Sequence, residues 1–291
     1  MGHYISMKIL IIAMIFLIII VSLILLTTRP QEIEGQYTPT SETQTTNLSL
    51  ILKPIKHCNT TIIIDNNPDS NLIATWGLSI LIDVPGLRIL FDTGPNPEVL
   101  KNNMEVLGID PRSIDIVVLS HEHGDHIGGL SFIAHVNPGI RVYVPSGMSD
   151  SVKDRIRSLD VEVIEIDKTT VIANGVAIIG EIYGPPWEQA LAVYVDGKGL
   201  IVFVGCSHPG VANIVGKAIN DLGVKTYMVI GGFHMAGASF SKCQMVINNL
   251  ISYGIEYIAP IHCSGDNIRS ILASSYPDHY IELHVGSHIQ I

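Results

Sequence analysis

The sequence predicts a mixed α/β (α+β) fold in which two halves, each made of strands and helices, pack sheet against sheet with their helices outside. Apolar residues make up 47% of the 291-residue chain and charged residues only 15%, which permits a large core and excludes wholesale disorder. Short β-branched runs alternate with segments of helical apolar spacing, and this order occurs in both halves of the chain. Reactive side chains follow several of the predicted strands.

The amino-terminal segment is the most apolar part of the chain. Residues 9–26 are all apolar except Ser22, and 18 such residues nearly span a hydrocarbon core of about 30 Å at about 1.5 Å per residue. No small-residue cleavage site follows, which favours an uncleaved anchor over a cleavable signal peptide. We therefore predict a membrane anchor or signal helix over residues 1–28, a flexible linker over 29–47, and a folded, extracytoplasmic domain over 48–291.

The first half of that domain is rich in strands. Strands are predicted over residues 48–53, 60–65, 78–84, 87–91, 114–119, 141–144 and 161–166, with Pro85-Gly86 turning a hairpin. Helices are predicted over residues 97–107, 128–135 and 149–159, where apolar residues recur every three or four positions. Gly108 stops the first of these helices.

The second half repeats this order. Strands are predicted over residues 176–182, 190–195, 200–205, 226–230, 257–261 and 280–285, and helices over 211–222 and 241–253.

The net charge is −10 and no cluster of Lys or Arg is present, which argues against a nucleic-acid partner. We expect a small-molecule substrate instead, and anionic or phosphorylated compounds are candidates.

The stretch 120–129 reads Ser-His-Glu-His-Gly-Asp-His-Ile-Gly-Gly and follows a predicted buried strand. Four metal-ligand side chains, His121, His123, Asp125 and His126, therefore lie on one tight loop. Two histidines at i and i+2 can face one metal ion, while the aspartate and the third histidine face a neighbouring one. The pattern predicts a site for a pair of metal ions.

Three further histidines follow predicted strands: His208, His234 and His262. Any one of them has an ordinary explanation as a hydrogen-bonded surface histidine. Their common position after successive strands predicts that they converge. Cys206 and Cys263 lie within two positions of these histidines, where a thiolate could contact metal or a buried thiol could be inert.

These motifs resemble those of the metallo-β-lactamase superfamily. The resemblance rests on Phe91-Asp92-Thr93-Gly94, on the His-x-His-x-Asp-His pattern of residues 121–126, and on the strand-end residues His208 and His262. Trp76-Gly77-Leu78-Ser79, Gly205-Cys206-Ser207-His208 and Gly231-Gly232-Phe233-His234 resemble more narrowly the branch named for 7,8-dihydropterin-6-methyl-4-(β-D-ribofuranosyl)-aminobenzene-5'-phosphate synthase. The superfamily implies an αββα sandwich with two divalent metal ions at one edge of the sheets, often zinc, with iron or manganese as alternatives.

The resemblance also implies roles for single residues. His121 and His123 would hold the first metal ion, and Asp125, His126 and His262 the second, with Asp92 orienting ligands from behind. The histidine that the superfamily has before predicted strand 190–195 is missing, and Glu188 stands at about that place; Cys206 stands where many members have a bridging aspartate. We predict His208 as the replacement ligand, with Cys206 or Glu188 as alternatives that otherwise support the site.

The resemblance leads to a metal-dependent hydrolase that activates water against an ester, phosphoester or amide-like bond. Asp125 is expected to orient the nucleophile, and His234 to donate a proton to the leaving group or hold a substrate phosphate. One alternative is a dihydropteroate-synthase-like transferase that forms a carbon–nitrogen bond in methanopterin-type pterin synthesis. Another is a non-hydrolytic iron or redox module that works through Cys206 and Cys263.

Overall fold

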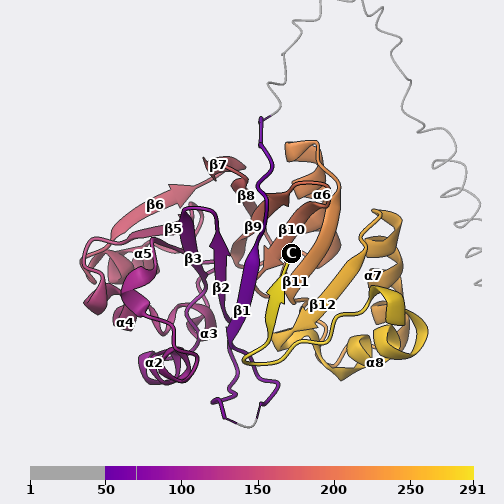
Figure 1. The fold of residues 1–291 in the computed structure, drawn as a ribbon, viewed down its shortest axis with the longest axis horizontal. Coiled ribbons are helices and arrows are strands. Elements are labelled where there is room, and N and C mark those ends of the chain that lie inside the picture. Colours follow the sequence, from indigo (N-terminus) through magenta and orange to yellow (C-terminus); the bar gives the residue numbers. More distant parts are fainter. Residues whose placement is uncertain (1–49, 70) are drawn as a thin grey trace, which may run out of the picture. The chain divides into compact units, whose positions relative to one another are not determined.

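Two β-sheets form the centre of the fold (Figure 1). The computed structural model describes residues 50–69 and 71–291, and the predicted anchor and linker fall among residues 1–49, outside this part of the chain. Within the described part, no helix has the length and apolar character needed to cross a membrane. The amino-terminal anchor therefore stays a prediction.

The first sheet has seven strands in the order β13-β1-β2-β3-β4-β5-β6. Its strands are β1 (Asn59–Ile64), β2 (Ser79–Val84), β3 (Leu87–Phe91), β4 (Ile116–Val118), β5 (Arg141–Pro145), β6 (Glu162–Ile166) and β13 (His288–Gln290). The strands from β13 to β3 pair antiparallel, and those from β3 to β6 pair parallel. In this parallel part, β3 and β4 end at the same edge of the sheet.

The second sheet has six strands in the order β12-β11-β10-β9-β8-β7. Its strands are β7 (Thr170–Ala173), β8 (Val176–Tyr183), β9 (Trp187–Val195), β10 (Gly199–Val204), β11 (Thr226–Gly232) and β12 (Tyr257–Ile261). The strands β10, β11 and β12 are parallel, so the loops that follow them leave the same edge.

The helices cover the outer faces of the two sheets, as Figure 1 shows. The first sheet carries α2 (Pro97–Val106), α4 (Leu130–Val136) and α5 (Asp150–Arg157), and the second carries α6 (Val211–Leu222), α7 (Phe240–Ser252) and α8 (Asp266–Ser275). Short helical turns are α3 (Gly124–Ile127), η1 (Pro111–Ser113), η2 (His262–Ser264) and η3 (Pro277–His279). Between the sheets lies a core that joins Phe91 to Phe203. The predicted αββα sandwich is confirmed.

Several predicted elements differ from the structure. Residues 50–53 form no strand, and of predicted strand 280–285 only Tyr280 pairs, in a single bridge to Ile258. The chain instead ends in β13, which takes the edge position beside β1. Predicted helix 128–135 begins later, at Leu130, because residues 124–127 form the separate turn α3. β7 and α8 were not predicted, although Ile268, Ile271 and Leu272 carry the helical spacing that buries one face of α8.

Candidate metal centre

The candidate ligands come from loops that leave the strand ends of both sheets. The loop after β4 carries His121, His123, Asp125 and His126; the loops after β10, β11 and β12 carry Cys206 and His208, then His234, then His262 and Cys263. Parallel strands deliver these loops to one edge of each sheet, and packing sheet on sheet brings the two edges together. The site therefore joins residues from both halves of the domain.

His121, His123 and His208 form the first ligand group, which we call the all-imidazole group. Their ligand atoms lie within 4.8 Å of one another. The His121 Nε2 and the His123 Nδ1 are 3.0 Å apart, and the His208 ring centroid lies 4.7 Å from that of His121. His121 is buried, whereas His123 is exposed. Through the exposed His123, solvent and a substrate can reach this group.

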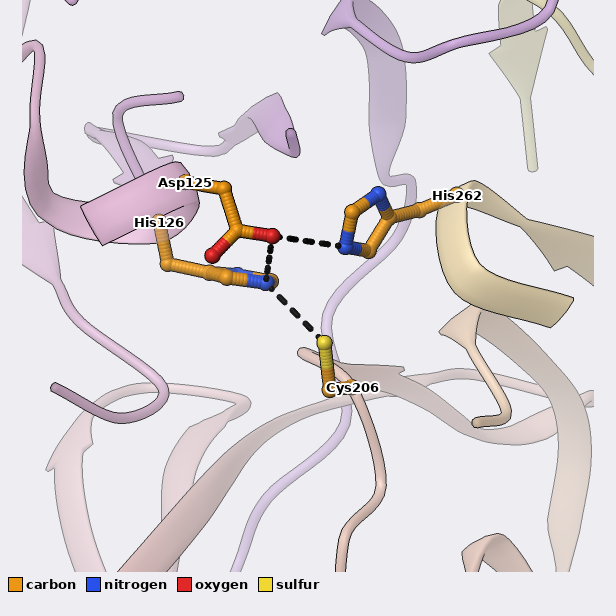
Figure 2. Close-up of side chains that lie close together, drawn as sticks. All are labelled: Asp125, His126, Cys206 and His262. Carbon is orange, nitrogen blue, oxygen red and sulfur yellow. Dashed lines mark hydrogen bonds and ion pairs between the residues drawn. The ribbon is translucent and has the colours of Figure 1, made fainter. Parts of the chain in front are cut away.

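Asp125, His126, Cys206 and His262 form the second group, the mixed group (Figure 2). The His126 Nε2 lies 3.1 Å from the Cys206 Sγ, and the His262 Nε2 lies 3.3 Å from the Asp125 Oδ2. Three of the four side chains are buried. Apart from this contact with the Asp125 carboxylate, the buried His262 Nε2 has no hydrogen-bond partner among the described residues, which is the situation of a nitrogen that is oriented toward a metal ion.

The pKa shifts of His121 and Asp125, one residue in each group, favour the form that binds a metal ion. Burial and the neighbouring imidazoles hold the pKa of His121 well below its usual value, so the ring is neutral and its lone pair is available. Burial raises the pKa of the Asp125 carboxyl, but the hydrogen bond with His262 and the charge of His126 outweigh it and lower the pKa overall. Imidazoles, a carboxylate and a thiol together fit a divalent cation of intermediate softness.

Asp92 contacts His126 directly and His121 through Ser120, and so connects the two groups. Its Oδ1 accepts a hydrogen bond from the Ser120 N–H at 2.7 Å, and its Oδ2 lies 2.7 Å from both the Ser120 hydroxyl and the His126 Nδ1. The Ser120 Oγ also lies 2.8 Å from the His121 Nδ1. One buried carboxylate thus orients a histidine of each group, with Nε2 left to face the metal position.

Two glycines allow the histidine loop to pack this closely against the Asp92 turn. A Cβ at Gly128 would lie 1.9 Å from the Pro95 carbonyl oxygen, and one at Gly129 would lie 2.1 Å from the Thr93 carbonyl oxygen. Any side chain at either position would push the loop away from the turn. The Gly-Gly pair after the histidines is therefore required by the geometry of the site.

Glu188 lies on β9 and holds the loop after β10. Its Oε1 accepts the N–H groups of Cys206 and Ser207 at 2.9 and 2.7 Å. Its Oε2 accepts the His208 N–H at 2.8 Å and lies 2.9 Å from the His208 Nδ1. With both oxygens engaged in this way, Glu188 orients His208 from behind, and it belongs to neither ligand group.

Cys206, Cys263 and His234 form a third cluster beside the mixed group. The contact with the Cys206 thiol lowers the pKa of Cys263 despite its burial, and the same contact together with burial raises the pKa of Cys206. The His234 ring centroid lies 4.6 Å from that of His208. Cys206 thus belongs both to the mixed group and to this cluster, whereas we predicted it as an alternative to His208 or as a residue that supports the site.

Three residues that orient the site were not predicted: Ser120, Asp65 and Asn66. Asp65 follows β1, is buried, and accepts the His262 N–H through Oδ1 at 2.6 Å, while the Asn66 Oδ1 lies 3.3 Å from the His262 Nδ1. The available signal was an acidic residue directly after a predicted strand, a position that Asp92 also has after residues 87–91. Ser120 had no comparable signal.

Comparisons with known proteins agree with this architecture. Residues 87–180 match the family model of the beta-lactamase superfamily domain. The chain is 30% identical over 266 residues to 7,8-dihydropterin-6-methyl-4-(beta-D-ribofuranosyl)-aminobenzene-5'-phosphate synthase of Methanocaldococcus jannaschii, which covers 74% of this chain and 89% of that protein. It is 32% identical to ribonuclease Z of Nanoarchaeum equitans, over 43% of this chain and 42% of that one.

The fold is similar to that of Tm1679, a metal-dependent hydrolase of the beta-lactamase superfamily, with a TM-score of 0.69, 22% identity, and 80% of this chain and 99% of that chain covered. The chain therefore belongs to the metallo-β-lactamase superfamily, and it is an enzyme of that fold. Within the superfamily it belongs to the branch of the Methanocaldococcus jannaschii synthase, as the sequence motifs predicted.

Proposed function

We propose that this chain is a metal-dependent hydrolase whose two ligand groups hold a pair of divalent ions. The observation that carries the proposal is that the two groups are adjacent. The ring centroids of His121 and His126, one residue from each group, lie 4.1 Å apart. When bound, such a pair of ions polarises a substrate oxygen and lowers the pKa of a coordinated water to about 7. We expect zinc first, with iron or manganese as alternatives.

The chain's own residues supply the remaining functions. His121, His123 and His208 would hold one ion, and Asp125, His126, Cys206 and His262 the other. The ionised Asp125 carboxylate, which lies at the boundary of the mixed group, would also accept a hydrogen bond from the attacking water and so orient it. His234 is exposed, and its pKa is raised by its contact with Cys263, so it is suited to donate a proton to a leaving group.

A substrate screen with matched histidine variants tests the proposal. Phosphodiester, lactone and β-lactam compounds are assayed with the wild-type protein, with His123→Ala and with His135→Ala, an exposed histidine on α4. We expect hydrolysis of at least one compound class, loss of more than about a hundredfold in His123→Ala, and no change in His135→Ala. Hydrolysis that survives in His123→Ala would belong to another protein or another site.

Metal analysis of protein purified without added metal gives an independent test. About two ions per chain are expected, and fewer than one would contradict the paired centre. Iron together with reversible oxidation of Cys206 and Cys263 would instead favour the redox module, because those two thiols adjoin the mixed group.

A second candidate function is carbon–nitrogen bond formation, which the 30% identity to the Methanocaldococcus jannaschii synthase favours. An aromatic amine would attack the methylene carbon of a pterin methyl diphosphate, and diphosphate would leave with the bonding electron pair while the amine loses its proton. Diphosphate release that requires both substrates would support this candidate. Fusion of residues 1–35 to a reporter bears on the choice, because a cytoplasmic location would favour pterin synthesis and an extracytoplasmic one the hydrolase.

A further inference from the structure

The histidines of the two ligand groups are not all oriented in the same way. Three of them have a short contact at Nδ1, between 2.7 and 2.9 Å: His121 with Ser120, His126 with Asp92, and His208 with Glu188. Among the described residues, the His262 Nδ1 has only the Asn66 amide oxygen, at 3.3 Å. Because a hydrogen bond weakens with length, His262 is the one of these four that its own hydrogen bond orients least.

The main chain of His262 is fixed, although in an unfavourable conformation. Its φ of 51° lies in the left-handed region, which a residue with a side chain rarely adopts and which persists only where neighbouring groups hold it. The His262 N–H donates to the Asp65 Oδ1 at 2.6 Å and supplies such a contact. The backbone position is therefore defined, and the direction of the imidazole ring depends on what packs against it.

The ring of Trp76 packs against this imidazole. The centroids of the Trp76 and His262 rings lie 4.9 Å apart, and the ring planes are tilted by 57°. His126 also contacts His262, at 5.0 Å between ring centroids, but His126 is completely buried. Trp76 is 53% exposed and His262 only 1%, so the indole lies on the solvent side of the imidazole and covers it.

The segment on both sides of the indole is attached to residues that hold the mixed group. The Thr75 N–H donates to the Asp65 carbonyl oxygen at 3.2 Å. The Leu78 N–H donates to the Asp125 carbonyl oxygen, also at 3.2 Å. Gly77 has a φ of 153°, and a Cβ there would lie 2.8 Å from the same Asp125 oxygen, so this close approach requires glycine. The exposed tryptophan is thus held in one place by the backbone around it.

We propose that Trp76 is a positioning residue of the mixed group, which holds the His262 ring toward the metal position and slows release of the ion. The inference rests on the proposed pair of ions. Asp125 is the one ligand of this group that is not buried, and its Oδ2 lies 3.3 Å from the His262 Nε2. Water or a chelator therefore reaches the group from the side that Asp125 and His262 share, and the indole covers the His262 part of that side.

The rate at which a chelator removes cobalt from the full-length protein tests the proposal. Cobalt bound at Cys206 gives a thiolate band, and decay of this band after addition of EDTA measures release from the mixed group. We expect release to become about tenfold faster in Trp76→Ala and to stay within about threefold of wild type in Trp76→Phe, which restores a ring. Equal rates in wild type and Trp76→Ala would overturn the proposal.

The matched control is the other tryptophan of the chain, Trp187, which lines a cavity together with His123 of the all-imidazole group. Trp187→Ala should leave decay of the thiolate band within about twofold of wild type. Capture of the remaining cobalt by a chromogenic chelator measures release from the all-imidazole group. A general loosening of the fold in Trp76→Ala would accelerate both releases equally, and that result would overturn a role specific to the mixed group.

A second measurement uses the chelator-treated protein and needs no bound ion. Diethyl pyrocarbonate modifies accessible imidazoles, and mass spectrometry of the peptides reports each histidine separately. We expect His262 to react at least about fivefold faster in Trp76→Ala than in wild type, with exposed His135 on α4 unchanged as the internal reference. Unchanged modification of His262 would overturn the proposal. Because this measurement requires neither turnover nor metal, it can fail while two ions and hydrolysis are found, and it can succeed where they are not.

Discussion

The two ligand groups differ in chemistry and in exposure. The all-imidazole group has three imidazole donors, of which His123 is exposed and only His121 is buried. The mixed group combines a carboxylate, a thiol and two imidazoles, and three of its four side chains are buried. Because it includes a charged ligand and is more buried, the mixed group should hold its ion more tightly. The all-imidazole group, which adjoins a cavity lined by Tyr183 and Trp187, should contact the substrate.

The largest effect is expected from the carboxylate that distinguishes the groups. Asp125→Asn removes the negative ligand of the mixed group, so activity should fall by more than about a hundredfold and one ion per chain should be lost. Metal analysis and the hydrolysis assay measure this. Asp150→Asn, an exposed aspartate on α5, is the control. Two tightly bound ions in Asp125→Asn would mean that the groups do not differ as proposed.

Asp92 supports both groups, so its substitution should weaken both. Asp92→Asn loses the charge that orients His126 directly and His121 through Ser120. Affinity for each ion should fall by about 10- to 100-fold, measured by competition with a chromogenic chelator. Asp83→Asn changes a surface aspartate paired with Arg88 and should leave both affinities unchanged. A loss confined to one group would show that Ser120 does not transmit the effect.

Substitution of Glu188 should weaken the all-imidazole group more than the mixed group, which is the reverse of the effect of Asp125→Asn. Glu188→Gln places an amide NH₂ against N–H donors of the Cys206–His208 loop, which should displace His208 and lower affinity at the all-imidazole group about tenfold. The buried mixed group should change less. Complete loss of one ion, equal to that in Asp125→Asn, would instead identify Glu188 as a ligand.

Cobalt substitution tests, without turnover, whether the Cys206 thiol of the mixed group binds the metal ion. Cobalt in this group should give a thiolate charge-transfer band in the near ultraviolet, which Cys206→Ser should abolish with an activity loss of only a few-fold to tenfold. Cys243→Ser, a buried cysteine of α7 outside both groups, should retain the band. A band that persists in Cys206→Ser would assign the ligand to Cys263.

The smallest effect concerns acid stability of the chelator-treated protein. The pKa of buried His121 lies well below the ordinary value that the unfolded chain retains, about 6.5, so below this pH only the unfolded chain binds the proton. This term therefore lowers the free energy of unfolding as pH falls, by up to about 1.4 kcal/mol per pH unit, and vanishes above about pH 7.5. His126, whose pKa is raised because Asp92 outweighs burial, acts in the opposite direction.

Comparison with a variant isolates the His121 term from that of His126. Urea unfolding at pH 7.5 and pH 5.5 should show a larger loss of stability for the wild-type protein than for His121→Asn. Equal losses in the two proteins would contradict a neutral, buried His121.

The sequence predicted what is contiguous in the chain. The four ligand-type residues of 121–126 follow one strand, so spacing alone identified them, and the strand–helix alternation identified the sandwich. Sequence reasoning was wrong for residues 280–285, which carry a strand pattern but form only a bridge at Tyr280, while the pairing position beside β1 goes to β13. Whether an edge segment pairs depends on which neighbour has an unpaired edge, and local propensity does not contain this information.

By itself, the sequence determined the fold class, the superfamily and the histidine loop, because hydrophobic periodicity and a compact motif are local properties. Only the tertiary structure decided how the scattered residues are divided. It grouped His208 with His121 and His123, grouped Cys206 with Asp125, His126 and His262, and turned Glu188 toward backbone N–H groups. The physical reason is that these side chains come from different strands of two sheets, and the distances between them are set by strand order and sheet packing.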